Sequence, residues 1–138
     1  MLIGELADAL GRIGQIAEAL ATVDAAIERS GRTEEGWIVA ELLRIKAELL
    51  LQQGEHGSGT VAEHHFGQAI DRSRRQGALS WELRAATNAA RRLRDQGRHA
   101  DAIFRVQQVY VRFTEGLATA DLIAAKQLLD EIGDAPRD

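Results

Sequence analysis

Cysteine is absent from this 138-residue chain, and Pro136 is its single proline. Without cysteine the chain has no disulfide, no thiolate metal ligand and no cysteine nucleophile, and this usage predicts a reducing, cytoplasmic setting. Aromatic residues make up only 4% of the chain. No apolar run approaches the roughly 18 to 20 residues that a membrane span requires, and the first residues lack the pattern of a signal peptide. We therefore expect a cytoplasmic protein that does not associate with membranes.

The apolar residues that are present follow a helical period. Hydrophobic residues make up 45% of the chain, and alanine and leucine supply most of them. Between residues 37 and 53, for example, Ile38, Leu42, Ile45 and Leu49 recur at three- and four-residue steps, which places them on one face of a helix. The same period recurs along the chain, so the sequence predicts an all-α fold.

Three glycines divide the chain into similar units. Gly14, Gly54 and Gly97 each follow a helical stretch, at spacings of 40 and 43 residues. Each unit is typical of two antiparallel helices, and such hairpins stack into a solenoid that presents a binding surface. We expect a single domain over residues 1–132, with hairpins at about 2–31, 34–76 and 79–115, a capping helix at 119–132, and a frayed tail at 133–138.

Alanines recur at fixed places around these glycines. One set stands seven residues before each glycine and consists of Ala7, Ala47 and Ala90. A second set follows the glycines and consists of Ala19, Ala62 and Ala102, with a slightly longer loop before Ala62. Two helices joined by a short turn approach closely only where both carry small side chains, so we expect Ala7 to face Ala19 and Ala90 to face Ala102.

Polar residues suggest where some helices begin. Residues 60 to 63, Thr-Val-Ala-Glu, have the pattern of a capping box, which predicts a helix that begins at Thr60 after a glycine-rich loop over residues 55–59. Ser80 and Thr119 are candidate N-caps for the first helix of the third hairpin and for the capping helix.

On these positions the chain resembles the tetratricopeptide-repeat family. The family pattern of a small residue, a turn glycine and alanines in the second helix appears as Ala7, Gly14, Ala19 and Ala26, again as Ala47, Gly54, Ala62 and Ala69, and in part as Ala90, Gly97 and Ala102. The resemblance implies a superhelix in which the first helix of each hairpin lines a concave groove for a partner protein. The spacing here exceeds the family's period of about 34 residues, and the family's closing proline and early aromatic residues are missing.

The last sixty residues or so have a narrower resemblance. The motifs that carry it lie at residues 81–86, 93–98, 110, 113–116, 121–122, 125–126 and 128–131. In this order they are similar to the C-terminal repeat tail of large bacterial signalling proteins that couple a nucleotide cyclase domain and an AAA-type ATPase module to such a tail. This resemblance implies a regulatory module in bacterial signalling. The chain has no phosphate-binding glycine-lysine loop, so it implies neither cyclase nor ATPase activity here.

Arginine is concentrated in one part of the chain. Residues 72 to 112 contain ten arginines and three acidic residues, whereas the whole chain has a net charge of −4. Arg84, Asn88, Arg91 and Arg94 recur at intervals of three and four, so they share a face of one helix, and Arg44 is the aligned arginine of the second hairpin. Arginine binds carboxylates with a planar fork of donors. The pattern predicts a concave-face site for an acidic peptide or partner protein.

Three other interpretations remain open. The arginines are also typical of a solvated helix face, where acidic residues of the preceding repeat, such as Glu41, Glu48 or Glu63, neutralise them. A transcription-associated module could bind nucleic acid through residues 72–98, although no base-stacking aromatics accompany that basic segment. An open end of the array could also drive formation of a homo-oligomer.

Catalytic and metal-binding patterns are weak. His56, His64 and His65 lie near the second turn, but adjacent histidines on a helix point about 100° apart and no suitably spaced carboxylate completes a metal shell. No nucleophile, base and oxyanion donor come together in the sequence. We therefore predict no enzymatic activity, no metal and no cofactor.

Overall fold

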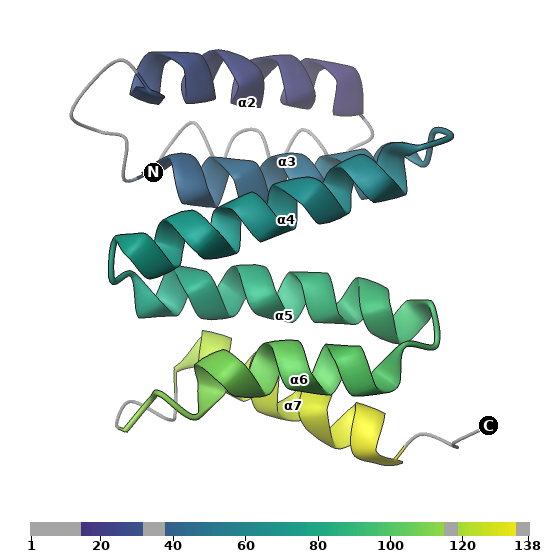
Figure 1. Cartoon of the computed structure of the whole chain (residues 1–138). Helices are drawn as coiled ribbons and strands as arrows, with labels where there is room; N and C mark the ends of the chain where they lie inside the picture. The colour runs from purple at the N-terminus through teal and green to yellow at the C-terminus, as the bar shows by residue number, and fades with distance from the viewer. Residues whose placement is uncertain (1–14, 32–37, 115–118, 135–138) are drawn as a thin grey trace. The chain divides into compact units, whose positions relative to one another are not determined.

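A computed structural model describes residues 15–31, 38–114 and 119–134, and these residues fold into helices without any strand. The helices are α2 (Ile16–Gly31), α3 (Val39–Gln53), α4 (Ser58–Arg75), α5 (Leu79–Asp95), α6 (His99–Tyr110) and α7 (Ala120–Asp134) (Figure 1). The prediction of an all-α fold is confirmed for this part of the chain. Ala7 and Gly14, on which the first hairpin depends, lie outside the described residues.

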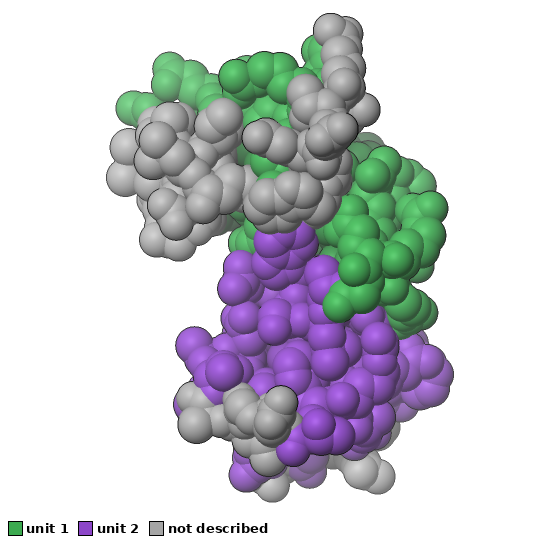
Figure 2. Space-filling view, turned by 90° about the vertical axis from the view of Figure 1, so that its left-hand side faces the viewer, with its two compact units in different colours: residues 1–77 green, residues 78–138 purple. Residues whose placement is uncertain are grey.

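The chain forms two compact units, residues 1–77 and residues 78–138 (Figure 2). Unit 1 contains α2, α3 and α4, and unit 2 contains α5, α6 and α7. The predicted second hairpin corresponds to α3 and α4, the third to α5 and α6, and the predicted capping helix to α7. The prediction of a frayed tail from residue 133 is wrong at its start, because α7 continues to Asp134. A single repeat domain over residues 1–132 stays a prediction.

In unit 1, α3 packs against both α2 and α4. The contact between α2 and α3 is made by the apolar stripes that the helical period predicts, and its buried members are Ala19, Val23, Ala26, Leu42, Ile45 and Leu49. Helix α4 contributes Ala62, Phe66 and Ala69, which are fully buried. Phe66 is the largest of the fully buried side chains.

In unit 2, the three helices pack against one another. The buried apolar side chains of α5 include Leu83, Ala86 and Ala90, those of α6 are Ala102, Val106 and Val109, and those of α7 are Leu122, Ala125, Leu128 and Ile132. Ala47 and Ala62 in unit 1, like Ala90 and Ala102 in unit 2, are fully buried on paired helices. The direct contact between Ala90 and Ala102 stays a prediction.

The turn between α5 and α6 depends on Gly97. Its φ of +79° is a left-handed conformation that favours glycine. The Gly97 amide donates a hydrogen bond to the carbonyl of Arg94 at 2.9 Å, and the Arg98 amide donates one to the carbonyl of Leu93 at 2.8 Å. This pair of bonds is a Schellman motif, which satisfies the last carbonyls of α5 and reverses the chain. Gly54 has a φ of +67° at the corresponding turn after α3.

Two predicted helix starts are wrong. Helix α4 begins at Ser58, two residues before Thr60, because Gly57 adopts a left-handed conformation and turns the chain earlier than the capping box predicts. Helix α5 begins at Leu79, and no side chain caps it. The Ala78 carbonyl accepts a hydrogen bond from the Glu82 amide at 3.0 Å, so the first helical bond forms before Ser80. By contrast, Thr119 directly precedes α7 as predicted.

Among the described residues, no helix combines the length and the apolar composition needed to cross a membrane.

Candidate interaction surface

Arg84 of α5 forms a two-point ion pair with the last helix. Its Nε donates a hydrogen bond to Asp121 Oδ1 at 3.2 Å, and its Nη2 donates one to Asp121 Oδ2 at 3.0 Å. The side chains remain 39% and 29% exposed, respectively. A parallel fork of this kind fixes the orientation of both groups, but exposure of this degree keeps the gain in stability small.

Arg94, ten residues further along α5, repeats this contact. Its Nη1 donates a hydrogen bond to Glu131 Oε2 at 2.7 Å, and its Nε donates one to Asp95 Oδ1 at 3.2 Å. Both bonds between α5 and α7 join residues that are 37 positions apart. The two pairs lie two to three turns apart along α5, and the separation in sequence between the partners is the same in both. Helices α5 and α7 must therefore run parallel, and α6 is antiparallel to both, as Figure 1 shows.

Arg91 lies between these two pairs. The helical period places it within about 20° of Arg84 around the α5 axis, and about 60° from Arg94. Its side chain is exposed, and within the described part of the chain it makes no hydrogen bond or ion pair. Asn88, on the same face, is only 9% exposed and has interactions of its own. Of the four predicted positions on α5, Arg91 is therefore the one that is exposed and has no partner among the described residues.

The fifth predicted position, Arg44, lies in unit 1. Its Nη2 donates to Glu41 Oε1 at 2.7 Å and its Nε donates to the same oxygen at 3.1 Å. Both side chains are largely buried. The alternative interpretation named Glu41 as a partner for arginines of the following repeat, whereas this bond joins it to an arginine of its own helix. The inclusion of Arg44 in one site with Arg91 stays a prediction.

A further ion pair lies at the beginning of α5. Glu82 is completely buried, and Arg112, just after α6, donates from Nη1 to both of its carboxylate oxygens at 2.9 Å. A buried carboxylate needs a partner of opposite charge, because desolvation penalises the ionised form. This bond therefore ties the end of α6 to the first turn of α5.

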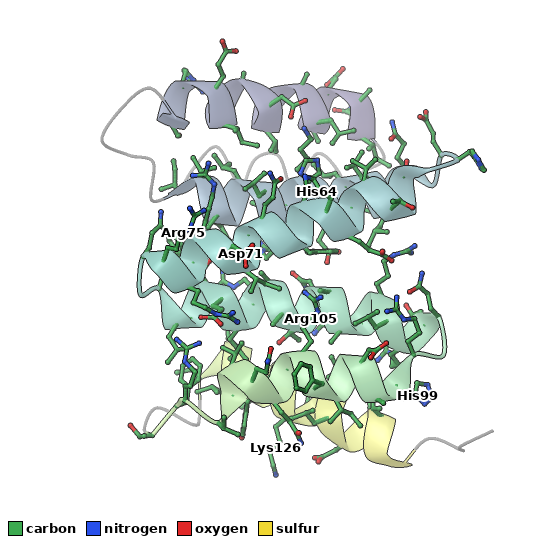
Figure 3. The ribbon with its side chains drawn as sticks, viewed as in Figure 1. His64, Asp71, Arg75, His99, Arg105 and Lys126 are labelled. Atoms are coloured by element: carbon green, nitrogen blue, oxygen red, sulfur yellow. The ribbon has the colours of Figure 1, made fainter. Side chains whose placement is uncertain are left out.

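The histidines of α4 form a separate group in unit 1. The rings of His64 and His65 lie 5.8 Å apart between centroids, and Figure 3 labels His64 on α4. His65 Nδ1 is 2.9 Å from Gln68 Oε1. Burial is the main cause that lowers the pKa of His65 below 6.5, with smaller contributions from the nearby Lys46 and His64. No group of three or more histidine or acidic side chains in the described ranges has the geometry to hold a metal ion.

The carboxylates that pair with the arginines of α5 were not among the residues predicted from the sequence. Asp121 and Glu131 belong to the last helix, and nothing local in the sequence associates them with Arg84 and Arg94. One signal was present, since both arginine–acid pairs have the same spacing along the chain. The Glu82–Arg112 pair carried no comparable signal.

Searches for similar proteins add nothing to this geometry, because the chain matches no protein-family model, no curated protein and no solved structure.

Proposed function

We propose that this chain is a tetratricopeptide-like repeat module that binds an acidic segment of a partner protein, in a regulatory role in bacterial signalling. One observation supports the repeat architecture most strongly. Helices α5 and α7 run parallel, in a register held by two ion pairs of equal separation, and α6 lies antiparallel to both. Such an arrangement repeats when hairpins stack in a solenoid, where each repeat contacts only its neighbours.

The proposed site centres on Arg91. Its guanidinium is exposed and has no partner among the described residues, so a carboxylate that approaches it displaces only water. Arg84 and Arg94 lie on either side of it along α5. Their bonds to Asp121 and Glu131 join side chains that are 29% to 61% exposed, and pairs with this much access to solvent contribute about 0 to 1 kcal/mol. A competing carboxylate from a partner can therefore exchange with these internal partners at little expense.

The ligand class follows from the donor chemistry. Arginine side chains in a row favour a chain with several carboxylates over a single anion, because each further pair adds to the affinity. The internal partners of Arg84 and Arg94 are themselves carboxylates, which shows what those guanidinium groups accommodate. We infer an acidic peptide segment as the ligand. Nucleic acid fits less well, since aromatic stacking groups do not accompany these arginines.

Fluorescence anisotropy of a labelled peptide rich in glutamate and aspartate tests this proposal with the full chain. We expect saturable binding that weakens as salt increases, and Arg91→Ala should lower the affinity and the salt dependence. Arg72→Ala is the matched control, because it removes the same charge from another exposed position, on α4. An equal loss in both variants would mean that only net charge matters, and tighter binding of a random DNA duplex would favour the nucleic-acid alternative. Either result, or no binding of the peptide, would refute the proposed site.

A further inference from the structure

The outer side of α6 carries two large apolar side chains in water. Phe104 is 64% exposed and Val111 is 71% exposed. Val111 is the C-cap residue of α6 and keeps a right-handed helical conformation, so the seven-residue separation places both side chains on nearly the same side, about 10 Å apart along the helix axis. The residues that α6 buries, Ala102, Val106 and Val109, lie on the opposite side. Scattered exposed apolar residues are common on proteins, but these two are aligned along the side of α6 that faces away from the core of unit 2.

Arginines accompany α6 as a basic flank. Arg105 lies within the helix, Arg98 is its N-cap residue and Arg112 follows its C-cap. Figure 3 labels Arg105, which makes no hydrogen bond or ion pair within residues that the structure describes. Arg112 is 44% exposed and binds Glu82 through Nη1, and its Nε and Nη2 have no acceptor among the residues that the structure describes. Arg98 pairs with Asp101 at 3.1 Å, and both side chains are more than half exposed.

Glutamines complete this surface. Gln107 and Gln108 are exposed between Phe104 and Val111. Their side chains are polar but uncharged, so they do not oppose the approach of a second helix. We name Phe104, Arg105, Gln108, Val111 and Arg112 the α6 outer face.

We propose that the α6 outer face docks one amphipathic, acidic helix of a partner protein. Apolar anchors two turns apart match the i and i+7 positions of a helix that lies along α6. The basic flank supplies the charge complementarity, since carboxylates beside the partner's apolar row would meet Arg105 and the unused donors of Arg112. This surface lies on a different helix from Arg91, and it does not depend on the acidic-segment site proposed above.

The test uses the full chain and a labelled synthetic helix as the probe. The probe has leucines at seven-residue intervals, glutamates beside them, and alanine and glutamine elsewhere, and a second probe has lysine in place of each glutamate. We expect saturable binding of the acidic probe and at least about tenfold weaker binding of the basic one. Phe104→Ser should weaken binding of the acidic probe by about tenfold or more, because it removes the largest apolar contact. Arg105→Gln should weaken it severalfold and reduce its salt dependence.

Matched controls separate this surface from general stickiness. Ile123→Ser removes an exposed apolar residue of α7, and Arg72→Ala removes an exposed arginine of α4; both variants should bind the acidic probe as the unmodified chain does. Val111→Ser repeats the test at the second anchor. Because Phe104 and Val111 are exposed, helicity and urea unfolding should change little in either variant.

Three outcomes would overturn the proposal. The first is an absence of binding by the acidic probe, and the second is an equal loss in Phe104→Ser and Ile123→Ser. The third comes from sedimentation across a range of protein concentrations. If the unmodified chain forms a dimer that Phe104→Ser abolishes, the occupant of the α6 outer face is a second copy of this chain and not an acidic partner helix.

Discussion

Replacing Arg112 with alanine should destabilise unit 2 far more than replacing an arginine that only faces solvent, such as Arg91. Glu82 is completely buried, and Arg112 donates two hydrogen bonds of 2.9 Å to it. The variant leaves a carboxylate in the interior without its neutralising group. Breaking a buried ion pair in this way costs about 3 to 5 kcal/mol.

The structure indicates the lower end of this range. Arg112 is 44% exposed, so water already reaches part of the pair. Glu82 also lies in the first turn of α5, where the helix dipole favours a negative charge. We therefore expect Arg112→Ala to lower the free energy of unfolding by about 3 kcal/mol.

The variant Glu82→Gln separates the effect of charge from that of packing. Glutamine has nearly the same size and carries no charge, and Arg112 can return to water, so this variant should cost only about 1 kcal/mol. In the Glu82→Gln background, the Arg112→Ala change should then cost little, which gives a large coupling energy in the double-mutant cycle. Equal losses in the two single variants would show that packing and not charge determines the effect.

Tryptophan fluorescence during urea unfolding provides the assay. The chain has two tryptophans, and a Trp37→Phe background leaves Trp81, the neighbour of Glu82 on α5, as the reporter of unit 2. Circular dichroism on the same samples checks that the reporter follows the loss of helix. If Arg112→Ala changes the free energy of unfolding by less than about 0.5 kcal/mol, as a typical surface substitution does, the buried-charge argument is wrong.

Three further predictions concern stability and use the same urea assay, followed by circular dichroism. Burial lowers the pKa of His65 below 6.5, so the unfolded chain binds a proton at this imidazole more readily than the folded chain does. The stability that neutral His65 contributes is therefore complete above pH 6.5 and is lost as the pH falls below that value. His65→Gln should remove this dependence of stability on pH. Gly67→Ala should stabilise the chain by about 0.5 to 1 kcal/mol, because alanine favours the helix more than glycine does and an added Cβ in α4 meets nothing within 4 Å. Gly97→Ala should instead destabilise the chain by about 1 kcal/mol, because the φ of +79° at this position is strained for alanine. Ala90→Leu should cost about 1 to 3 kcal/mol by overpacking a fully buried position, and Ala100→Leu, at an exposed position of α6, should be nearly neutral.

The sequence predicted the helices well because their signals are local. Apolar residues at three- and four-residue steps define each stripe, and a glycine after the stripe ends the helix by the left-handed turn seen at Gly97. Helix starts were harder to predict. Thr60 and Ser80 have side chains that can cap a helix. Helix α4 nevertheless begins before Thr60 because of the conformation of Gly57, and α5 begins before Ser80 because the Ala78 carbonyl accepts the first helical hydrogen bond. Alternative first residues of a helix differ in free energy by only about 1 kcal/mol. A sequence motif does not distinguish differences of this size.

The arginine surface was predictable only in part. The spacing of Arg84, Arg91 and Arg94 placed them on one side of a helix, and this is a property of helical geometry alone. Which of them stays exposed depends on what α7 brings against that side. Asp121 and Glu131 come from a helix that is distant in sequence, so their pairing is a tertiary property.

The alanine-rich core of unit 2 explains why ion pairs of little energetic worth still matter for the proposed function. Small side chains such as Ala86, Ala90 and Ala125 let helices approach closely, but they interlock weakly, because they offer few projections that oppose sliding along the helix axis. A slip of α7 by one turn, about 5.4 Å, would break both of its pairs with Arg84 and Arg94 at once. Two partly exposed pairs of equal spacing thus favour the observed register of α7. If a partner's carboxylates displace Asp121 and Glu131, they also release this restraint, so binding at Arg91 and the position of α7 are energetically coupled.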